Sequence, residues 1–166
     1  MPLLSRLILV TFTTILLSAC GWHLRGQVNM PVALRILDLN VSSVDFVSQN
    51  AIKQSLLSNG VTLSQDADYE LRILKEESGK RTLAVTSNAK ASEYELIQSL
   101  TFQLFDTDKQ AISEALTVST YQTLLYDADA EIGKAQEEQN LRIEMKQSNA
   151  YKMLLRLKNI TLTTTK

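Results

Sequence analysis

The sequence predicts an α/β (α+β) fold, in which a mixed four-stranded sheet carries two helices packed on one face. Two patterns of apolar residues lead to this prediction. Apolar and polar residues alternate, as in strands, in several segments between residues 33 and 126, and apolar residues recur at helical spacing over residues 44–56 and 131–158. The predicted order is strand, helix, three antiparallel-linked strands, helix. The first helix is then a crossover, and both helices cover the apolar face of the sheet.

The first strand is predicted over residues 33–39, where both faces carry apolar side chains, as is typical of a strand inside a sheet. A helix follows, with Ser42 or Ser43 as its N-cap and Gly60 as the residue that closes it. The apolar stripe of this helix is predicted to lie on the sheet, and it consists of Val44, Val47, Ala51, Ile52 and Leu56.

The middle of the chain alternates as strands do, with a first hairpin turn predicted at Ser78-Gly79. A longer alternation over residues 94–104 predicts one buried face and one mostly wet face. The polar residues 106–109 predict the next turn, and apolar residues return on a second arm over residues 112–126.

A second helix is predicted from Glu131 to Lys158. Its apolar stripe is imperfect, because Gln139 and Lys146 interrupt it. We therefore expect part of this helix to be exposed or to meet a partner. Residues 161–166 are expected to form a flexible tail.

The first twenty residues have the pattern of an export signal. Arg6 precedes an apolar stretch that is too short to cross a bilayer, so residues 1–19 are predicted to be a signal peptide and no transmembrane helix is expected in the mature chain. The following Cys20 is the only cysteine, and residues 17–20 (LSAC) resemble the lipobox of bacterial lipoproteins, in which that cysteine is acylated. The alternative is that Cys20 is a small residue near an ordinary cleavage site. With lipidation, residues 20–31 form the lipidated N-terminus and a linker.

Composition excludes several classes of function. The 17 basic and 18 acidic residues give a net charge of −1, so the chain lacks the positive field with which proteins hold nucleic acid. One cysteine and one histidine cannot build a disulfide framework or a His-based zinc site, and no cofactor or metal site is predicted. Because His23 lies three residues from the presumed lipid anchor and no nucleophile motif accompanies it, no catalytic residue is predicted and the chain is not expected to be an enzyme.

Basic residues gather modestly around the predicted first hairpin and at the start of the second helix. One interpretation is that they are solvated charges, some of which protect a sheet edge. The other is a patch that binds the phosphates of an anionic lipid, for which both Arg and Lys are suited. The residues concerned are Lys75, Lys80, Arg81, Lys90 and Lys134.

Three motifs together resemble the LptE family of lipopolysaccharide-assembly lipoproteins. These are residues 20–25 (CGWHLR) after the lipobox, residues 54–61 (QSLLSNGV) at the end of the first helix, and Ser92-Glu93-Tyr94 within a long strand. The order of elements agrees over nearly the whole mature chain. The resemblance implies that residues 32–160 form a single LptE-like domain.

The resemblance implies an outer-membrane lipoprotein that plugs the LptD barrel, assists its assembly, and takes part in the insertion of lipopolysaccharide into the outer leaflet. Gly21 after the cysteine is similar to lipoproteins that are delivered to the outer membrane. Family members use basic residues at two positions to contact lipopolysaccharide. Here Lys134 falls within about one residue of the second position, and Arg81 or Lys90 would substitute at the first, where this chain has Ser87. The alternative is a free-standing periplasmic lipoprotein that binds another envelope ligand.

Overall fold

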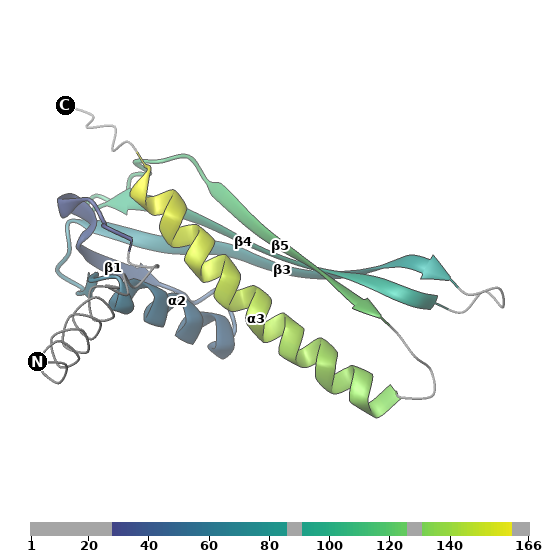
Figure 1. Cartoon of the computed structure of the whole chain (residues 1–166). Coiled ribbons are helices and arrows are strands. Elements are labelled where there is room, and N and C mark those ends of the chain that lie inside the picture. The colour runs from purple at the N-terminus through teal and green to yellow at the C-terminus, as the bar shows by residue number, and fades with distance from the viewer. Residues whose placement is uncertain (1–27, 86–90, 126–130, 161–166) are drawn as a thin grey trace, which may run out of the picture.

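The computed structural model describes residues 28–85, 91–125 and 131–160, which form one mixed sheet with two helices on one of its faces (Figure 1). The sheet has five strands in the order β2-β1-β3-β4-β5. Its elements in chain order are the 3-10 helix η1 (Val32–Leu34), β1 (Ile36–Asn40), α2 (Phe46–Ser58), β2 (Thr62–Leu63), β3 (Tyr69–Val85), β4 (Ala91–Asp106), β5 (Leu116–Leu125) and α3 (Glu131–Lys158).

The predicted mixed sheet and the two helices on one face are confirmed, with five strands instead of four. Strand β1 is parallel to both β2 and β3, whereas β3, β4 and β5 are antiparallel. The additional strand, β2, has only two residues, which is too short for a pattern of alternation to be recognised in a sequence.

Helix α2 begins later than predicted. Its N-cap is Asp45, whose side chain accepts a hydrogen bond from the backbone N–H of Ser48 at 2.9 Å, so the prediction of Ser42 or Ser43 was wrong. Val47 was also wrongly placed on the buried stripe: it is 39% exposed, and Ser48 lies in the core instead. The predicted end is confirmed, since Gly60 has a positive φ of 77° just after the helix.

Strand β3 runs without a turn through Ser78-Gly79, so the first hairpin turn was wrongly placed. The 17-residue strand pairs with β4 from Tyr69 to Val85, and Gly79 lies opposite Ile97. A Cβ atom on Gly79 would stand 3.5 Å from the Cβ of Ile97, which is ordinary van der Waals contact, so the glycine is here a strand residue. The pairing of β3 with β4 extends to Val85 and Ala91, and residues 86–90 between them lie outside the described residues.

Helix α3 has the predicted bounds, Glu131–Lys158. Its second half packs on the main core through Ala150, Met153, Leu154 and Leu157, all of which are buried. In its first half the side chains that the structure describes are mostly exposed or half-buried, as the interrupted stripe led us to expect. The predicted tail, residues 161–166, lies outside the described residues.

The core is divided in two. The main cluster lies between α2, the second half of α3 and the part of the sheet that contains β1, the start of β3 and the end of β4. A second cluster contains the buried residues Leu96, Leu124 and Met145. Helix α3 runs from the second cluster to the main one (Figure 1). The position of α3 therefore depends on both clusters and on what lies between them.

Candidate functional site

Two of the cations that the sequence singles out lie where strand β3 meets the first half of α3, namely Lys80 on β3 and Lys134 on α3. We call residues 80–85, 91–96, 121–125 and 131–145 the distal arm, because they extend away from the main cluster. Arg81 and Lys134 belong to it. The other two predicted site residues, Lys90 and the lipidation residue Cys20, lie outside the described residues.

Lys80 ties β3 to α3. It lies opposite Leu96 in the β3–β4 register, and since Leu96 is buried in the second cluster, Lys80 points to the helix-covered face. Its Nζ is 2.6 Å from Oε2 of Glu138 and 4.2 Å from the centre of the Tyr94 ring. A cation that bonds a carboxylate and contacts an aromatic ring holds the start of α3 against the sheet.

Glu138 is shared by two cations. Arg142 lies one helical turn after Glu138, and its Nη2 is 2.7 Å from Oε1 of Glu138. Burial of Glu138 acts to raise the pKa of its carboxyl, but the hydrogen bonds from Lys80 and Arg142 outweigh burial and hold the pKa below its usual value. The carboxylate is thus charged at neutral pH. Among the described residues, Nη1 of Arg142 is a buried nitrogen without a hydrogen-bond partner.

Lys134 lies one turn before Glu138 on α3. Its Nζ is 2.8 Å from Oε2 of Glu137, and its side chain is 22% exposed. Because residues four apart share a helix face, Lys134 is on the same face as Glu138 and Arg142. The helix therefore places Lys134 and Arg142 on the face that carries Glu138, the partner of Lys80.

Arg81 lies on the other face of the sheet. It is opposite Glu95 in the register, binds its Oε2 at 2.6 Å and has a side chain that is 64% exposed. Neighbouring residues of a strand point to opposite faces, so Arg81 and Lys80 cannot serve the same surface. The structure thus brings Lys80, not Arg81, next to the helix that carries Lys134.

The distal arm is a set of ion pairs rather than an open basic field. Each of these cations has a carboxylate within 2.8 Å. Such pairs can exchange a carboxylate for a phosphate, which accepts the same charge-assisted hydrogen bonds. The arrangement suits the binding of an anionic headgroup and contains no nucleophile beside a base.

A polar belt separates the two apolar clusters, and the sequence did not reveal it. Asn149 is 2% exposed, donates to the carbonyl oxygen of Gln98 at 2.9 Å and accepts from Oγ1 of Thr120 at 2.8 Å. Lys146, which the sequence showed only as an interruption, binds Asp45 at the N-cap of α2 and lies 3.9 Å from Glu76. The belt fixes the register of α3 over the sheet, because a shift of one residue would leave these buried groups unpaired.

A second buried carboxylate lies on the other face of the sheet, far along β3 from the distal arm. Glu70 is 4% exposed and accepts from Arg72, Lys109 and Asn40 at 2.8, 2.8 and 3.2 Å. Hydrogen bonding from Arg72 and Lys109 outweighs burial and lowers the pKa of Glu70 to about 2. Arg72 also lies 4.0 Å above the Phe105 ring. Lys109 is held in place by the predicted turn at 106–109, where it adopts a φ of 60°.

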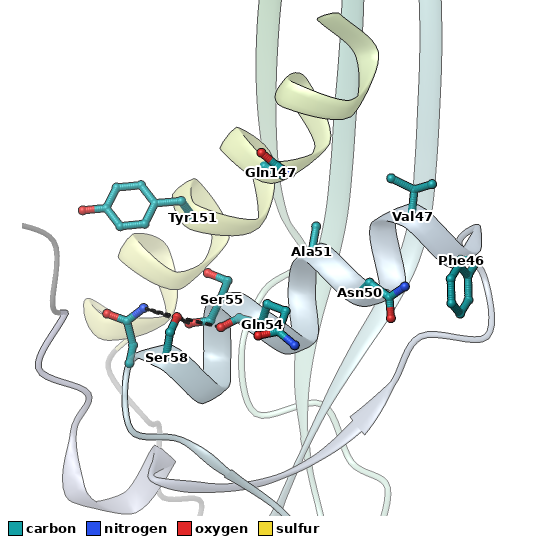
Figure 2. A pocket seen from close by; sticks show the side chains of 10 residues that line it. Phe46, Val47, Asn50, Ala51, Gln54, Ser55, Ser58, Gln147 and Tyr151 are labelled. Carbon is teal, nitrogen blue, oxygen red and sulfur yellow. Dashed lines mark hydrogen bonds between the residues drawn. The ribbon is translucent and has the colours of Figure 1, made fainter. Parts of the chain in front are cut away.

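An open groove of about 620 Å³ runs between α2 and α3 (Figure 2). Figure 2 shows exposed Phe46 and Val47 at one end and Tyr151 at the other, with amide side chains such as Asn50 and Gln147 between them. The lining contains neither a carboxylate nor a basic side chain.

Over residues 28–85, 91–125 and 131–160, no group of three or more His, Cys, Asp or Glu side chains could hold a metal ion. Within the same ranges, no helix is sufficiently long and apolar to cross a membrane.

Residues 36–157 match the family model described as LptE, lipopolysaccharide-assembly. The chain belongs to the LptE family. The resemblance drawn from the three motifs is thereby confirmed, although only two of the motifs fall inside the matched range. Since LptE proteins form a lipopolysaccharide-assembly family without enzymatic activity, the prediction that the chain is not an enzyme is confirmed as well.

Relatives of similar length have the same family name. LPS-assembly lipoprotein LptE of Pectobacterium atrosepticum is 26% identical over 157 residues, which cover 92% of this chain and 84% of that protein. The protein of the same name from Photorhabdus laumondii is 25% identical over 134 residues, covering 75% of this chain and 74% of that one.

Solved structures of bacterial lipoproteins have a similar fold. A minor lipoprotein from Acinetobacter baumannii superposes with a TM-score of 0.67 at 25% identity, covering 77% of this chain and 93% of that one. Lipoprotein B from Nitrosomonas europaea has the same TM-score at 18% identity, covering 83% of this chain and 90% of that one, and shows similarity of fold alone.

Proposed function

We propose that this chain is an outer-membrane lipoprotein, anchored through acylated Cys20, that plugs and assists assembly of the LptD barrel and takes part in lipopolysaccharide insertion into the outer leaflet. The observation that carries the proposal is the match of residues 36–157 to the lipopolysaccharide-assembly family. The relatives named LPS-assembly lipoprotein support it.

The open face of the sheet supports the role of a plug. On β4 and β5 this face carries rows of hydroxyl side chains, with Ser99 opposite Ser119 and Thr101 bonded to Thr117 through their hydroxyls at 2.9 Å. The lumen of a large outer-membrane barrel is polar, so a domain inside it should present hydrophilic surfaces. A hydroxyl-rich sheet face and the mostly polar first half of α3 fit that environment.

The distal arm supports contact with lipopolysaccharide phosphates. Lys80, Lys134 and Arg142 lie on the helix side of the arm, and Nη1 of Arg142 is a buried donor without a partner in the described structure. Of the residues that the sequence singled out, Lys80 and Lys134 belong to this group, and Lys134 is the one that was predicted to contact lipopolysaccharide. Arg81 serves the opposite face, and Lys90 follows it in the hairpin outside the described residues.

Affinity purification of the lipidated chain from outer membranes tests the partner. The proposal expects a large barrel protein to co-purify in equal amount, and depletion of the chain to block the delivery of lipopolysaccharide to the cell surface. A stable monomer without a barrel partner, in cells whose surface lipopolysaccharide is normal, would refute the proposal and favour a free-standing envelope lipoprotein.

Charge reversal at Lys134 tests the lipid contact. Lys134→Asp should weaken lipopolysaccharide binding in vitro by about tenfold, because a charge-assisted hydrogen bond is replaced by repulsion, while the fold remains intact. The matched control is Lys53→Asp on the exposed side of α2, which should bind as the wild type does. Equal binding by all three proteins would remove Lys134 from the site.

A further inference from the structure

Strand β5 is one of the long edges of the sheet. It contains ten residues, pairs with β4 on one side, and has no strand on the other side within the part of the chain that the structure describes. The opposite edge, β2, has two residues. Beyond Arg72, where β1 no longer pairs with it, β3 has a second long edge, but a bulge and the charged residues Lys75, Glu76, Glu77, Lys80 and Arg81 protect that edge. β5 is therefore the long edge without such protection.

The backbone groups that point to the open edge can be identified from the register. The N–H of Leu104 donates to Oγ of Ser113 at 3.1 Å, and its carbonyl accepts from the N–H of Ile112 at 3.0 Å, so the backbone of Leu104 faces the β5 side. The β4–β5 register continues without a shift from Phe102↔Leu116 to Glu93↔Leu125. Even-numbered residues of β5 therefore bond to β4, and odd-numbered ones face outward.

A second contact agrees with this assignment. The carbonyl of Ser119, an odd-numbered residue, accepts from Nζ of Lys152 of α3 at 2.6 Å. The outward N–H and carbonyl groups of Thr117, Tyr121 and Thr123 have no neighbouring strand within the described residues. Edge groups of this kind are a template for pairing with another chain.

Strand β5 has almost none of the features that protect sheet edges. Its sequence, LTVSTYQTLL, contains no charged residue and no proline, and its pairing with β4 has no bulge. Natural edge strands are usually blocked by such features or by being very short. Here Lys152 covers one carbonyl, and the stretch beyond Ser119 remains open.

The neighbourhood of the edge indicates what kind of strand fits. A groove of about 340 Å³ lies between β5 and α3, lined by Thr117, Ser119, Lys152, Leu155 and Arg156 among others. Its two cations favour a segment that carries a carboxylate. Two copies of β5 paired antiparallel about their middle would bring both Lys152 side chains into the same stretch of the groove, about 7 Å apart along the strand, which disfavours self-pairing.

We propose that the edge of β5 from Thr117 to Thr123 receives an extended strand of a different polypeptide, which carries an acidic side chain opposite Lys152 and Arg156. The identity of this polypeptide rests on the proposed function, under which it is a segment of the LptD barrel protein. The paired strand adds backbone hydrogen bonds to the outward groups of Tyr121 and Thr123, and the groove beside α3 accommodates its side chains.

Hydrogen exchange of the β5 amides tests the pairing. The wild-type chain is measured alone and in the complex co-purified with LptD, with amide exchange resolved to single residues. In the free chain the even-numbered amides should be protected and the odd-numbered ones not. In the complex Thr117, Ser119, Tyr121 and Thr123 should slow by about tenfold or more. If the odd-numbered amides exchange as fast in the complex as in the free chain, the proposal is refuted.

A proline at an outward position gives a second test. Tyr121→Pro removes an N–H that β4 does not use, whereas Tyr121→Val removes the same ring and keeps the N–H. Loss of one inter-chain hydrogen bond should make the Tyr121→Pro complex dissociate at least about fivefold faster than the Tyr121→Val complex. Equal rates would refute the edge pairing.

The two proposals fail in different ways. If the wild-type chain forms no complex with the barrel protein, the proposed function fails, and the partner assigned here fails with it. If the complex forms without the alternating protection, only the edge pairing fails. Odd-numbered protection in the free chain together with a dimeric mass would show that the occupant is a second copy, and would overturn the proposal for a different polypeptide.

Discussion

Glu70 should make the stability of this protein depend on pH below about 5. The carboxyl is 4% exposed and bound by Arg72 and Lys109, which lowers its pKa from 4.5 to about 2. In the unfolded chain Glu70 binds a proton near its ordinary pKa, so its contribution is fully present above pH 4.5 and is lost as the pH falls towards 2. We test this contribution with Glu70→Gln.

The magnitude follows from the pKa. Each pKa unit corresponds to about 1.4 kcal/mol of unfolding free energy. Lys109 is 61% exposed, so solvent screens part of its interaction, and we expect the ionised Glu70 to contribute about 2 to 3 kcal/mol to the free energy of unfolding at neutral pH. Urea unfolding from pH 6 to pH 3 gives the difference in unfolding free energy between the wild type and Glu70→Gln. More than half of this difference should vanish by pH 3.

The control for this experiment is Glu77→Gln. Glu77 pairs with Lys75 at 2.7 Å, but both side chains are about 60% exposed, so the pair contributes little at any pH. A wild-type advantage over Glu70→Gln that stays constant from pH 6 to pH 3 would refute the ionic account of Glu70. A similar pH dependence in both variants would refute it as well.

Two other variants test the register and a helix end. Asn149→Ala removes two buried hydrogen bonds and leaves a small cavity, so it should lower the free energy of unfolding by about 2 to 3 kcal/mol. The control Asn140→Ala, on the exposed part of α3, should change the free energy of unfolding by less than about 0.5 kcal/mol. Gly60→Ala should lower the free energy of unfolding by about 1 kcal/mol, because Gly60 has a φ of 77°, which an alanine adopts only with strain. A Cβ at this position would meet no atom within 4 Å, so steric contact is not the cause. An unchanged urea midpoint would contradict the conformational explanation.

Long, strongly patterned segments were predicted well. Helix α3 has the predicted bounds, because 28 residues of good helix formers leave few alternatives. The buried parity of β4, which includes Leu96, Leu100, Phe102 and Leu104, follows from its sustained alternation. The closing position of α2 at Gly60 was also predictable, since a glycine after a helix is a local signal.

Features that depend on tertiary contacts were not predictable. Ser78-Gly79 has the composition of a turn, but pairing with β4 keeps it extended, because Ser78 and Gly79 lie opposite Gln98 and Ile97 in an unbroken stretch of ladder. Asp45 competes with two nearby serines as the N-cap, and its contact with Lys146, 101 residues away, favours it in the folded chain. Ser48 is buried and Val47 is exposed, because the Ser48 hydroxyl donates a hydrogen bond to Glu76 of β3 on the buried side of α2.

The candidate site was only partly predictable for the same reason. Sequence reasoning identified Lys134 and Arg81 as cations, but the face of each depends on strand parity and helix position. The bulge between Ile73 and Lys75 reverses the parity of β3, so that Glu76 and Lys80 point to the helices. No pattern in the sequence of β3 marks this bulge. The partnership of Lys80, Glu138 and Arg142 therefore appears only in three dimensions.

The distal arm combines a small apolar cluster with a concentration of ion pairs, which links binding to the position of α3. Only Leu96, Leu124 and Met145 are fully buried in its cluster, and the polar belt separates them from the main core. Burial of these three side chains supplies most of the attachment of the first half of α3 to the sheet, and the Lys80–Glu138 pair adds to it, whereas the Arg142–Glu138 pair lies within α3. A phosphate that takes Lys80 from Glu138 would remove the ionic part of that attachment. Under the proposed function, binding of lipopolysaccharide would then shift the start of α3 before it affects the main core.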